Sequence, residues 1–231
     1  MRRVTTTSTN SGRPAAKPRT SGEGATRRRA KGSPALASER REHLVKLAAE
    51  LFAKKGFQAT TVREIAEEAG ILSGSLYHHF DSKESMVDEI LTGFQEELFG
   101  RYEEIVARGM GPRETLEAVV VASFESIDRH HAEVAIYQNE AKYLAQFERF
   151  GYLRERNTQL RKLWAGILED GVRAGVFRAD LDVELVYRFI RDTVWVAVHW
   201  YRPGGELSAK AVAERYLGIL LDGIGTRRKR K

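Results

Sequence analysis

The chain of 231 residues contains no cysteine, which excludes disulfide bonds, catalytic thiolates and cysteine-ligated zinc. It also lacks any run of the roughly 18 to 20 apolar residues that a membrane-spanning helix requires. No apolar signal core is present near the N-terminus. We therefore expect a protein of the bacterial cytoplasm that needs neither a metal ion nor a disulfide to fold, and that makes no membrane contact.

Acidic residues are scarce at both ends of the chain. Residues 1–37 contain nine Lys or Arg and one Glu, and residues 227–231 are all basic. Because the net charge is only +6, the segment between them is net acidic. We predict a disordered basic arm over 1–37 and a basic tail over 225–231. Such arms suit a phosphate-rich partner, or they only increase solubility, and composition leaves both readings open.

From residue 38 onward the apolar residues recur at helical spacing, and no strand-length alternation is found. The sequence therefore predicts an all-α fold of about nine helices, with an N-terminal three-helix unit over 38–84 and a larger helical domain over 85–224. The predicted helices, with their expected caps, are 38–55 (Ser38), 62–69 (a capping box from Thr61 to Glu64), 73–80 (Ser73), 82–108 (Asp81 or Ser82), 113–130, 132–146, 148–174, 183–201 and 208–224.

The segment LSGSLYHHFDSKESMV over 72–87 gathers hydroxyl, imidazole and acid groups, as an active site would. However, His78 and His79 are consecutive, so on a helix they point about 100° apart and cannot chelate one metal ion. Ser75 and His79 lack an orienting acid and an oxyanion site. We expect no catalytic residue, no metal and no cofactor here.

A nucleic-acid interface fits the same segment better. Two short helices joined by a turn after Gly70 form a helix-turn-helix, whose second helix enters the DNA major groove. Small residues over 73–75 allow close approach of the backbone, and Tyr77 and His78 can donate hydrogen bonds to phosphates or bases. His79 is either a further contact or a core histidine. Lys83 opens the next helix, where its charge opposes the helix dipole and suggests a nearby anion.

Residues 44–91 carry a family resemblance through three ordered motifs: A-x-x-L-F-x-x-x-G-F, T-T-V-R-x-I-A and G-x-L-Y-x-H-F-x-x-K-E. This pattern closely resembles the DNA-binding domain of tetracycline-repressor (TetR) family regulators. The family often has a valine-serine pair before its recognition helix, where this chain has Ile71-Leu72-Ser73, so base preference cannot be copied from relatives. The resemblance implies DNA contacts by Thr61, Arg63, Ser73, Gly74, Ser75, Tyr77, His78 and Lys83.

The second half of the chain contains a candidate ligand site and a candidate dimer interface. Residues 183–201 are apolar around most of the predicted helix, which indicates burial on more than one side, and 208–224 supply a second apolar face for a homodimer. Arg191 has Tyr187 and Trp195 four residues away and no expected acid, because Asp192 is expected to pair with Arg188. Such a cation suits a carboxylate, phosphate or thioester. The alternative is a solvated stripe with a surface salt bridge.

Three C-terminal segments, AIYQNEAKYL, ERNTQLRKLW and LVYRFIRDTVWVAVHWYRPGG, resemble the TetR-family repressors of bacterial sterol breakdown, in particular those that act on the last two steroid rings. The resemblance covers 38 to about 222. It implies a homodimer on an inverted-repeat operator of double-stranded DNA, released by an acyl-CoA thioester of a bicyclic steroid intermediate. Two alternatives are a non-regulatory DNA-compacting protein and an acyl-CoA enzyme. The expected ligand contacts are Arg188, Arg191, Trp195, Tyr137 and Trp164, the last two also being candidate core residues.

Overall fold

The computed structural model describes residues 34–224. The predicted basic tail and nearly all of the predicted basic arm lie outside the described residues; within them, 34–37 already belong to the first helix. Among the described helices, none combines the length and apolar character needed to cross a membrane.

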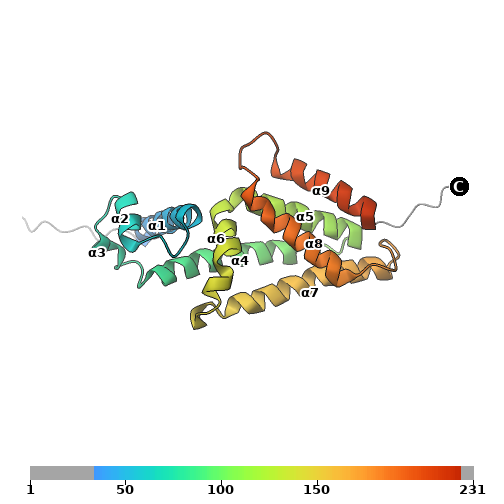
Figure 1. Cartoon of the computed structure of the whole chain (residues 1–231), viewed down its shortest axis with the longest axis horizontal. Helices are drawn as coiled ribbons and strands as arrows, with labels where there is room; N and C mark the ends of the chain where they lie inside the picture. Colours follow the sequence, from blue (N-terminus) through green and yellow to red (C-terminus); the bar gives the residue numbers. More distant parts are fainter. Residues whose placement is uncertain (1–33, 225–231) are drawn as a thin grey trace, which may run out of the picture.

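Over this range the chain is all-α, as predicted, with nine α-helices, two short 3-10 helices and no strand (Figure 1). The elements are α1 (Pro34–Lys55), α2 (Val62–Glu68), α3 (Ser73–Leu76), α4 (Lys83–Ala107), α5 (Pro112–Arg129), α6 (His131–Leu144), η1 (Glu148–Phe150), α7 (Tyr152–Arg173), α8 (Val183–Val196), η2 (Ala197–His199) and α9 (Ala209–Ile224).

Capping residues and glycines in the local sequence determine where several helices begin or end. Thr61 forms the predicted capping box with Glu64, and Ser82 rather than Asp81 caps α4. Gly56 and Gly70 end their helices with φ of 88° and 65°, a region that favours glycine. The prediction of Ser38 as a cap was wrong, because α1 begins four residues earlier and the Ser38 hydroxyl donates to Glu42 inside the helix.

Residues 73–80, predicted as the recognition helix and called the recognition segment from here on, also differ from their prediction. α3 ends at Leu76 instead of Phe80, and Leu72 rather than Ser73 occupies the N-cap position. After Leu76 the chain turns, with the Phe80 N–H donating to the Leu76 carbonyl at 3.0 Å. This turn buries Leu76 and Phe80, at 1% and 4% exposure.

α4 belongs to two hydrophobic cores. Its first half, from Met86 to Leu91, packs with α1, α2 and α3. Its second half, from Phe94 to Ile105, packs with α5, α7, α8 and α9. The first core also takes in Ile136 of α6 and Leu153 of α7, so the packing of the N-terminal unit extends beyond the predicted boundary at residue 84.

The helices of the larger unit surround α5. α5 packs against α4, α7, α8 and α9, while α6 crosses between this bundle and α1. Figure 1 shows α2 and α3 at one end of the molecule and α9 towards the other. The structure therefore places the helix-turn-helix at an exposed end, with α4 and α6 leading from it to the bundle.

Gly171 of α7 provides a test of core packing. A Cβ at this position would lie 2.1 Å from Cδ2 of the buried Phe177 ring, whereas one at Gly166 of the same helix would meet nothing within 4 Å. We expect Gly171→Ala to lower the free energy of unfolding by about 1–3 kcal/mol through overpacking. Gly166→Ala should instead raise it by about 0.5–1 kcal/mol, because alanine favours the helix. Urea denaturation would measure both, and equal effects of the two substitutions would contradict this packing.

Candidate functional site

The helix-turn-helix is formed by α2, a turn at residues 69–72, and α3. The turn is fixed by backbone hydrogen bonds from Gly70 to Glu67 and from Ile71 to Ala66, at 3.1 and 2.9 Å. The structure places the predicted DNA-contacting residues of α2 and α3 together on this unit. Side chains or backbone are exposed at Thr61, Arg63, Gly74, Tyr77 and His78, and half-buried at Ser73 and Ser75.

Two of these residues already have partners within α2. The Thr61 hydroxyl accepts from the Glu64 N–H at 3.2 Å, while Glu64 Oε2 accepts from the Thr61 N–H at 2.8 Å. Arg63 forms an exposed ion pair with Glu67 at 2.7 Å. An exposed pair of this kind contributes little stability, so the guanidinium can exchange Glu67 for a phosphate at small cost.

Lys83 has a structural role that the sequence did not reveal. Its ammonium donates to the carbonyls of Phe57, Thr60 and Gln58, at 2.7, 2.9 and 3.3 Å, and lies 4.4 Å from the centre of the Phe57 ring. These carbonyls stabilise the charge at the start of α4. A phosphate contact by Lys83 would therefore have to replace one of them.

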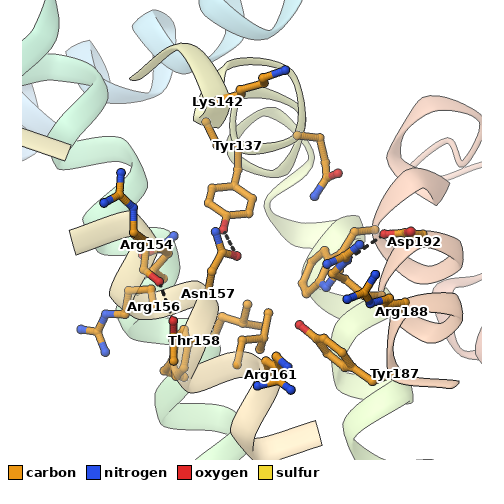
Figure 2. Close-up of a pocket in the computed structure, with 18 of the residues that line it drawn as sticks. Tyr137, Lys142, Arg154, Arg156, Asn157, Thr158, Arg161, Tyr187, Arg188 and Asp192 are labelled. Carbon is orange, nitrogen blue, oxygen red and sulfur yellow. Dashed lines mark hydrogen bonds and ion pairs between the residues drawn. The ribbon is translucent and has the colours of Figure 1, made fainter. Parts of the chain in front are cut away.

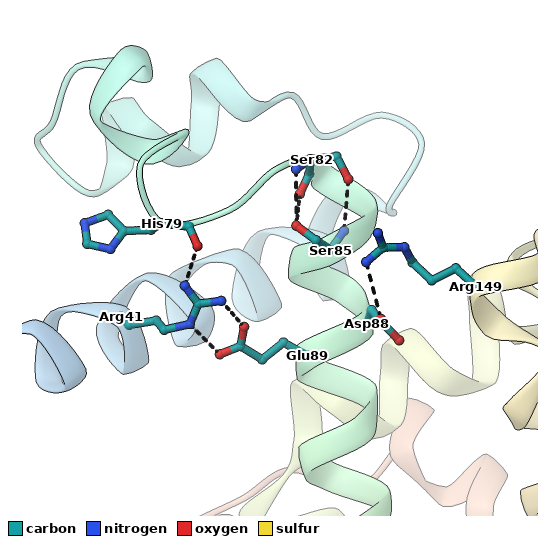
Figure 3. Close-up of polar contacts among 7 residues, drawn as sticks. All are labelled: Arg41, His79, Ser82, Ser85, Asp88, Glu89 and Arg149. Carbon is teal, nitrogen blue, oxygen red and sulfur yellow. Dashed lines mark hydrogen bonds and ion pairs between the residues drawn. The ribbon is translucent and has the colours of Figure 1, made fainter.

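Arg41 of α1 holds the end of the recognition segment (Figure 3). It pairs with both carboxylate oxygens of Glu89 on α4, at 2.6 and 3.0 Å, and donates to the His79 carbonyl. Its guanidinium also lies 4.2 Å from the centre of the Phe80 ring. One side chain thus connects α1, α4 and the chain leaving α3. The His79 ring is half-buried and lies against Phe80, so neither reading of His79 is eliminated.

A second set of contacts joins α4 to the start of α7. Arg149, in η1, forms an ion pair with Asp88 at 3.4 Å (Figure 3). One turn further along α4, the Thr92 hydroxyl donates to the Tyr152 hydroxyl at 3.2 Å. α4 is therefore connected on one side to the helix-turn-helix and on the other to α7.

A pocket of about 1050 Å³ lies between α4, α6, α7 and α8 (Figure 2). Four of the five predicted ligand contacts line it: Tyr137, Arg188, Arg191 and Trp195. Its apolar lining includes Phe94, Leu98, Phe99 and Leu160. A cavity of this size with an apolar wall and a few polar groups is typical of a small-molecule site.

Trp164 does not line this pocket. It is 2% exposed, and its ring packs edge-on against Tyr102 with centroids 6.1 Å apart. The structure thus places Trp164 in the core, which was the alternative reading of this residue. By contrast, Trp195 lines the pocket and packs edge-on against Phe94 at 6.4 Å.

The expected charge pairing on α8 was also wrong. Arg191 has an acid partner, Asp192, at 2.7 Å, whereas Arg188 pairs with Glu184 at 3.3 Å. The predicted aromatic neighbour is present, since the Arg191 guanidinium lies 5.8 Å from the centre of the Tyr187 ring. Because Arg191 and Asp192 are both well exposed at 44% and 63%, their ion pair can open for an anionic ligand at little cost.

Further basic residues of the pocket escaped sequence reasoning. Lys142, Arg154, Arg156 and Arg161 come from α6 and α7, and the structure alone brings them beside α8. Arg161 is paired with Glu184 at 2.7 Å, but Lys142 and Arg154 have no acidic partner within residues 34–224. With Glu184 and Asp192 as its only acids, the lining has a net positive charge, which favours an anionic ligand.

Two neutral polar groups complete the pocket. The Tyr137 hydroxyl donates to Asn157 Oδ1 at 2.6 Å, and burial raises the pKa of this phenol to about 12, so it stays a donor at neutral pH. Gln95 of α4 is 4% exposed, and its Oε1 has no hydrogen-bond partner among the described residues. The oxygen of such a buried amide can accept a hydrogen bond from a ligand. After rotation of the amide, its NH2 group can instead donate to a ligand carbonyl.

An exposed apolar face lies on the outer side of α8, and a further apolar side chain is exposed on α9. Phe189 is 61% exposed and Ile219 78%, and Leu185 and Val196 are each 45% exposed. The inner side of α8 is buried through Tyr187, Ile190 and Val194. Large apolar side chains gathered on one face are typical of a subunit interface.

Comparison with known proteins shows two family matches. Residues 44–90 match the family described as bacterial regulatory proteins, tetR family, and residues 109–224 match the tetracyclin repressor-like C-terminal domain.

Among curated relatives, the HTH-type transcriptional repressor KstR2 of Rhodococcus jostii is 62% identical over 189 residues, covering 82% of this chain and 93% of the relative. A solved structure of the ketosteroid transcriptional regulator KstR2 of Mycobacterium tuberculosis has 57% identity and a TM-score of 0.80, covering 81% of this chain and 96% of that one. The structure of AibR in complex with isovaleryl coenzyme A and operator DNA has a TM-score of 0.70 at 22% identity, covering 78% and 97%, which shows a shared fold.

The contact of Arg41 with Glu89 and the His79 carbonyl predicts a measurable loss of stability on substitution. Arg41→Gln should lower the free energy of unfolding by about 1–2 kcal/mol, after allowance for the partial exposure of this ion pair. Arg63→Gln, which breaks only an exposed pair within α2, should change it by less than about 0.5 kcal/mol. Urea denaturation of both variants would test this, and equal losses would contradict the assigned role of Arg41.

The capping box of α2 predicts a dependence of stability on acid pH. Hydrogen bonds from Lys55, the Thr61 N–H and the Thr61 hydroxyl lower the pKa of Glu64 from 4.5 to about 2. Because the folded pKa is depressed, this stabilisation is present above about pH 4.5 and is lost as pH falls towards 2. The difference in urea midpoint between wild type and Glu64→Gln should therefore be larger at pH 7 than at pH 3. A difference independent of pH would contradict the assignment.

Proposed function

The chain belongs to the TetR family of bacterial transcriptional regulators, and on that premise we propose that it is a homodimeric repressor of steroid-degradation genes, released from its operator by an acyl-CoA thioester. The observation that carries this proposal is the pocket, which combines an apolar wall with a net positive lining. A TetR-type regulator is not an enzyme, so this pocket would bind its ligand without converting it.

The DNA-binding half of the proposal rests on the exposed helix-turn-helix. Tyr77 and His78 present donors at the end of the recognition segment, and Arg63 adds a cation from α2. In a homodimer joined through the outer faces of α8 and α9, two such units would meet successive major grooves about 34–36 Å apart, or a multiple of that distance. The operator would then be an inverted repeat.

The proposed ligand, an acyl-CoA thioester, is chemically complementary to the pocket. The diphosphate or thioester of an acyl-CoA suits Arg191, whose present partner Asp192 is exposed, while the apolar ring body suits Trp195 and Phe94. The relatives named as KstR2, one of them called a ketosteroid regulator, support a steroid-derived acyl group. The name of the AibR structure records a coenzyme A thioester bound to a protein of the same fold.

Release would depend on α6. Tyr137, Gln138 and Lys142 line the pocket from this helix, whereas Glu140 Oε1 accepts the Phe57 N–H at 3.0 Å. The Phe57 and Thr60 carbonyls are in turn held by Lys83, next to the recognition segment. A ligand that shifts α6 would therefore change the position of the loop at 56–60.

A second connection runs through α7, whose first two turns carry the pocket residues Arg154 and Arg156. Arg149, just before this helix, and Tyr152, its first residue, contact Asp88 and Thr92 of α4. Ligand binding would favour a dimer whose two helix-turn-helix units no longer match the groove spacing. Operator affinity would then fall by the ratio of the ligand's affinities for the two conformations.

The proposal predicts separable effects on DNA and ligand binding. Arg191→Gln should raise the thioester concentration needed for half-release by roughly 10- to 100-fold, since a charge-assisted hydrogen bond is lost, and should leave operator affinity unchanged. Tyr77→Ala should weaken operator binding and leave thioester affinity unchanged. A gel shift on DNA upstream of the protein's own gene, at about 0.15 M salt with competitor DNA, would measure both.

Arg173→Gln is a suitable control, because Arg173 is an exposed arginine paired only with its neighbour Asp170 at the far end of α7. It should match wild type in both assays. A discrete protein–DNA complex that steroid acyl-CoA does not dissociate would contradict the proposed effector. It would leave the proposed role as a DNA-binding regulator unaffected. Binding without sequence preference would favour a DNA-compacting protein instead.

A further inference from the structure

Leu72 is placed unusually for a leucine. It occupies the N-cap position of α3, directly before the recognition residues, and its side chain is 81% exposed, the largest value among the exposed large hydrophobic residues of the described chain. Its neighbour Ile71 packs against the first core, so the turn already has an apolar anchor. Burial therefore does not explain the second apolar residue.

Helix capping does not explain it either. The helices before and after α3 are capped by Thr61 and Ser82, and each of these residues makes a full capping box. The backbone of Leu72, with φ −72° and ψ 142°, has the extended conformation of a capping residue, but its side chain makes no capping hydrogen bond. A serine or asparagine would stabilise α3 at this position. With leucine at this position, α3 lacks that stabilisation, and the leucine side chain is exposed to solvent.

The backbone of Leu72 is fixed, although its side chain is exposed. Its carbonyl accepts the Ser75 N–H at 2.8 Å, and the preceding turn is fixed by the hydrogen bond from Ile71 to Ala66. The side chains that follow are small, at Ser73, Gly74 and Ser75, so nothing bulky on α3 shields it before Leu76 turns inward. An unshielded apolar side chain on a fixed backbone thus lies at the N-terminal end of the recognition segment.

In a helix-turn-helix, residues at the N-terminal end of the recognition helix are those that reach base edges. The major groove presents one apolar group, the C5 methyl of thymine, and side chains recognise it by apolar contact. We propose that Leu72 is a specificity-determining residue that contacts a thymine methyl in each half-site of the operator. This inference rests on the proposed DNA-binding function and adds a base preference to it.

The experiment uses the full-length protein and operator duplexes selected by wild type from a random library. Each thymine of a half-site is replaced in turn by uracil, which removes only the methyl group. We expect one position at which uracil weakens wild-type binding roughly fourfold, the effect of burying about one methyl group, and roughly 15-fold when both half-sites are changed. Leu72→Ala should bind the thymine duplex more weakly by a comparable factor and should not distinguish thymine from uracil at that position.

Leu72→Ser separates this role from a structural one. It should supply the missing cap and raise the thermal midpoint by roughly 2–4 °C while weakening operator binding like Leu72→Ala. If no uracil substitution affects wild type, or if Leu72→Ala retains the same discrimination, the inference is overturned and the regulator stands. A lower thermal midpoint in Leu72→Ser would assign Leu72 to the fold instead. Failure of wild type to select any duplex would overturn the proposed function, and this inference with it.

Discussion

The structure depends on α4 belonging to both hydrophobic cores. A helix whose two halves are buried in different cores cannot move in one without straining the other. On its first two turns, Lys83 holds the loop at 56–60 and Glu89 holds Arg41, which in turn holds the chain leaving α3. On the next turns, Thr92 contacts Tyr152, and Gln95 lines the pocket. The surface that would bind DNA and the pocket are thus parts of one mechanical unit.

The pocket itself combines two kinds of binding. Phe94, Leu98 and Trp195 form an apolar wall, while arginines from α7 and α8 supply positive charge. Most of these arginines are exposed and already paired with acids, so an anionic ligand would exchange one partner for another rather than desolvate a free charge. Such an exchange costs little, so the charge-assisted contacts of the ligand and its fit to the apolar wall both contribute to its affinity. This division suits an effector with a polyanionic carrier and an apolar ring system.

Sequence reasoning was most successful where local chemistry decides the structure. The helical periodicity and the capping box from Thr61 to Glu64 are properties of short segments, and both were predicted. It failed where a partner comes from a distant segment. Nothing near Lys83 in the chain indicates that carbonyls 23 to 26 residues earlier would hold it. For the same reason Trp164 could not be separated from pocket residues, and the basic side chains of α7 were missed. The pairing of Arg191 with the adjacent Asp192 was missed for another reason, because helical spacing rules compare residues three or four apart.

Coupling between the pocket and the helix-turn-helix is the central claim, and thermodynamic linkage provides its most direct test. Calorimetric titration would measure the affinity of a steroid-derived acyl-CoA for the free protein and for the protein saturated with operator. Because coupling is reciprocal, the thioester should bind the operator complex more weakly by the same factor by which it weakens operator binding. Equal thioester affinity in the two states would show that the pocket and the DNA-binding surface act independently, and would contradict the account.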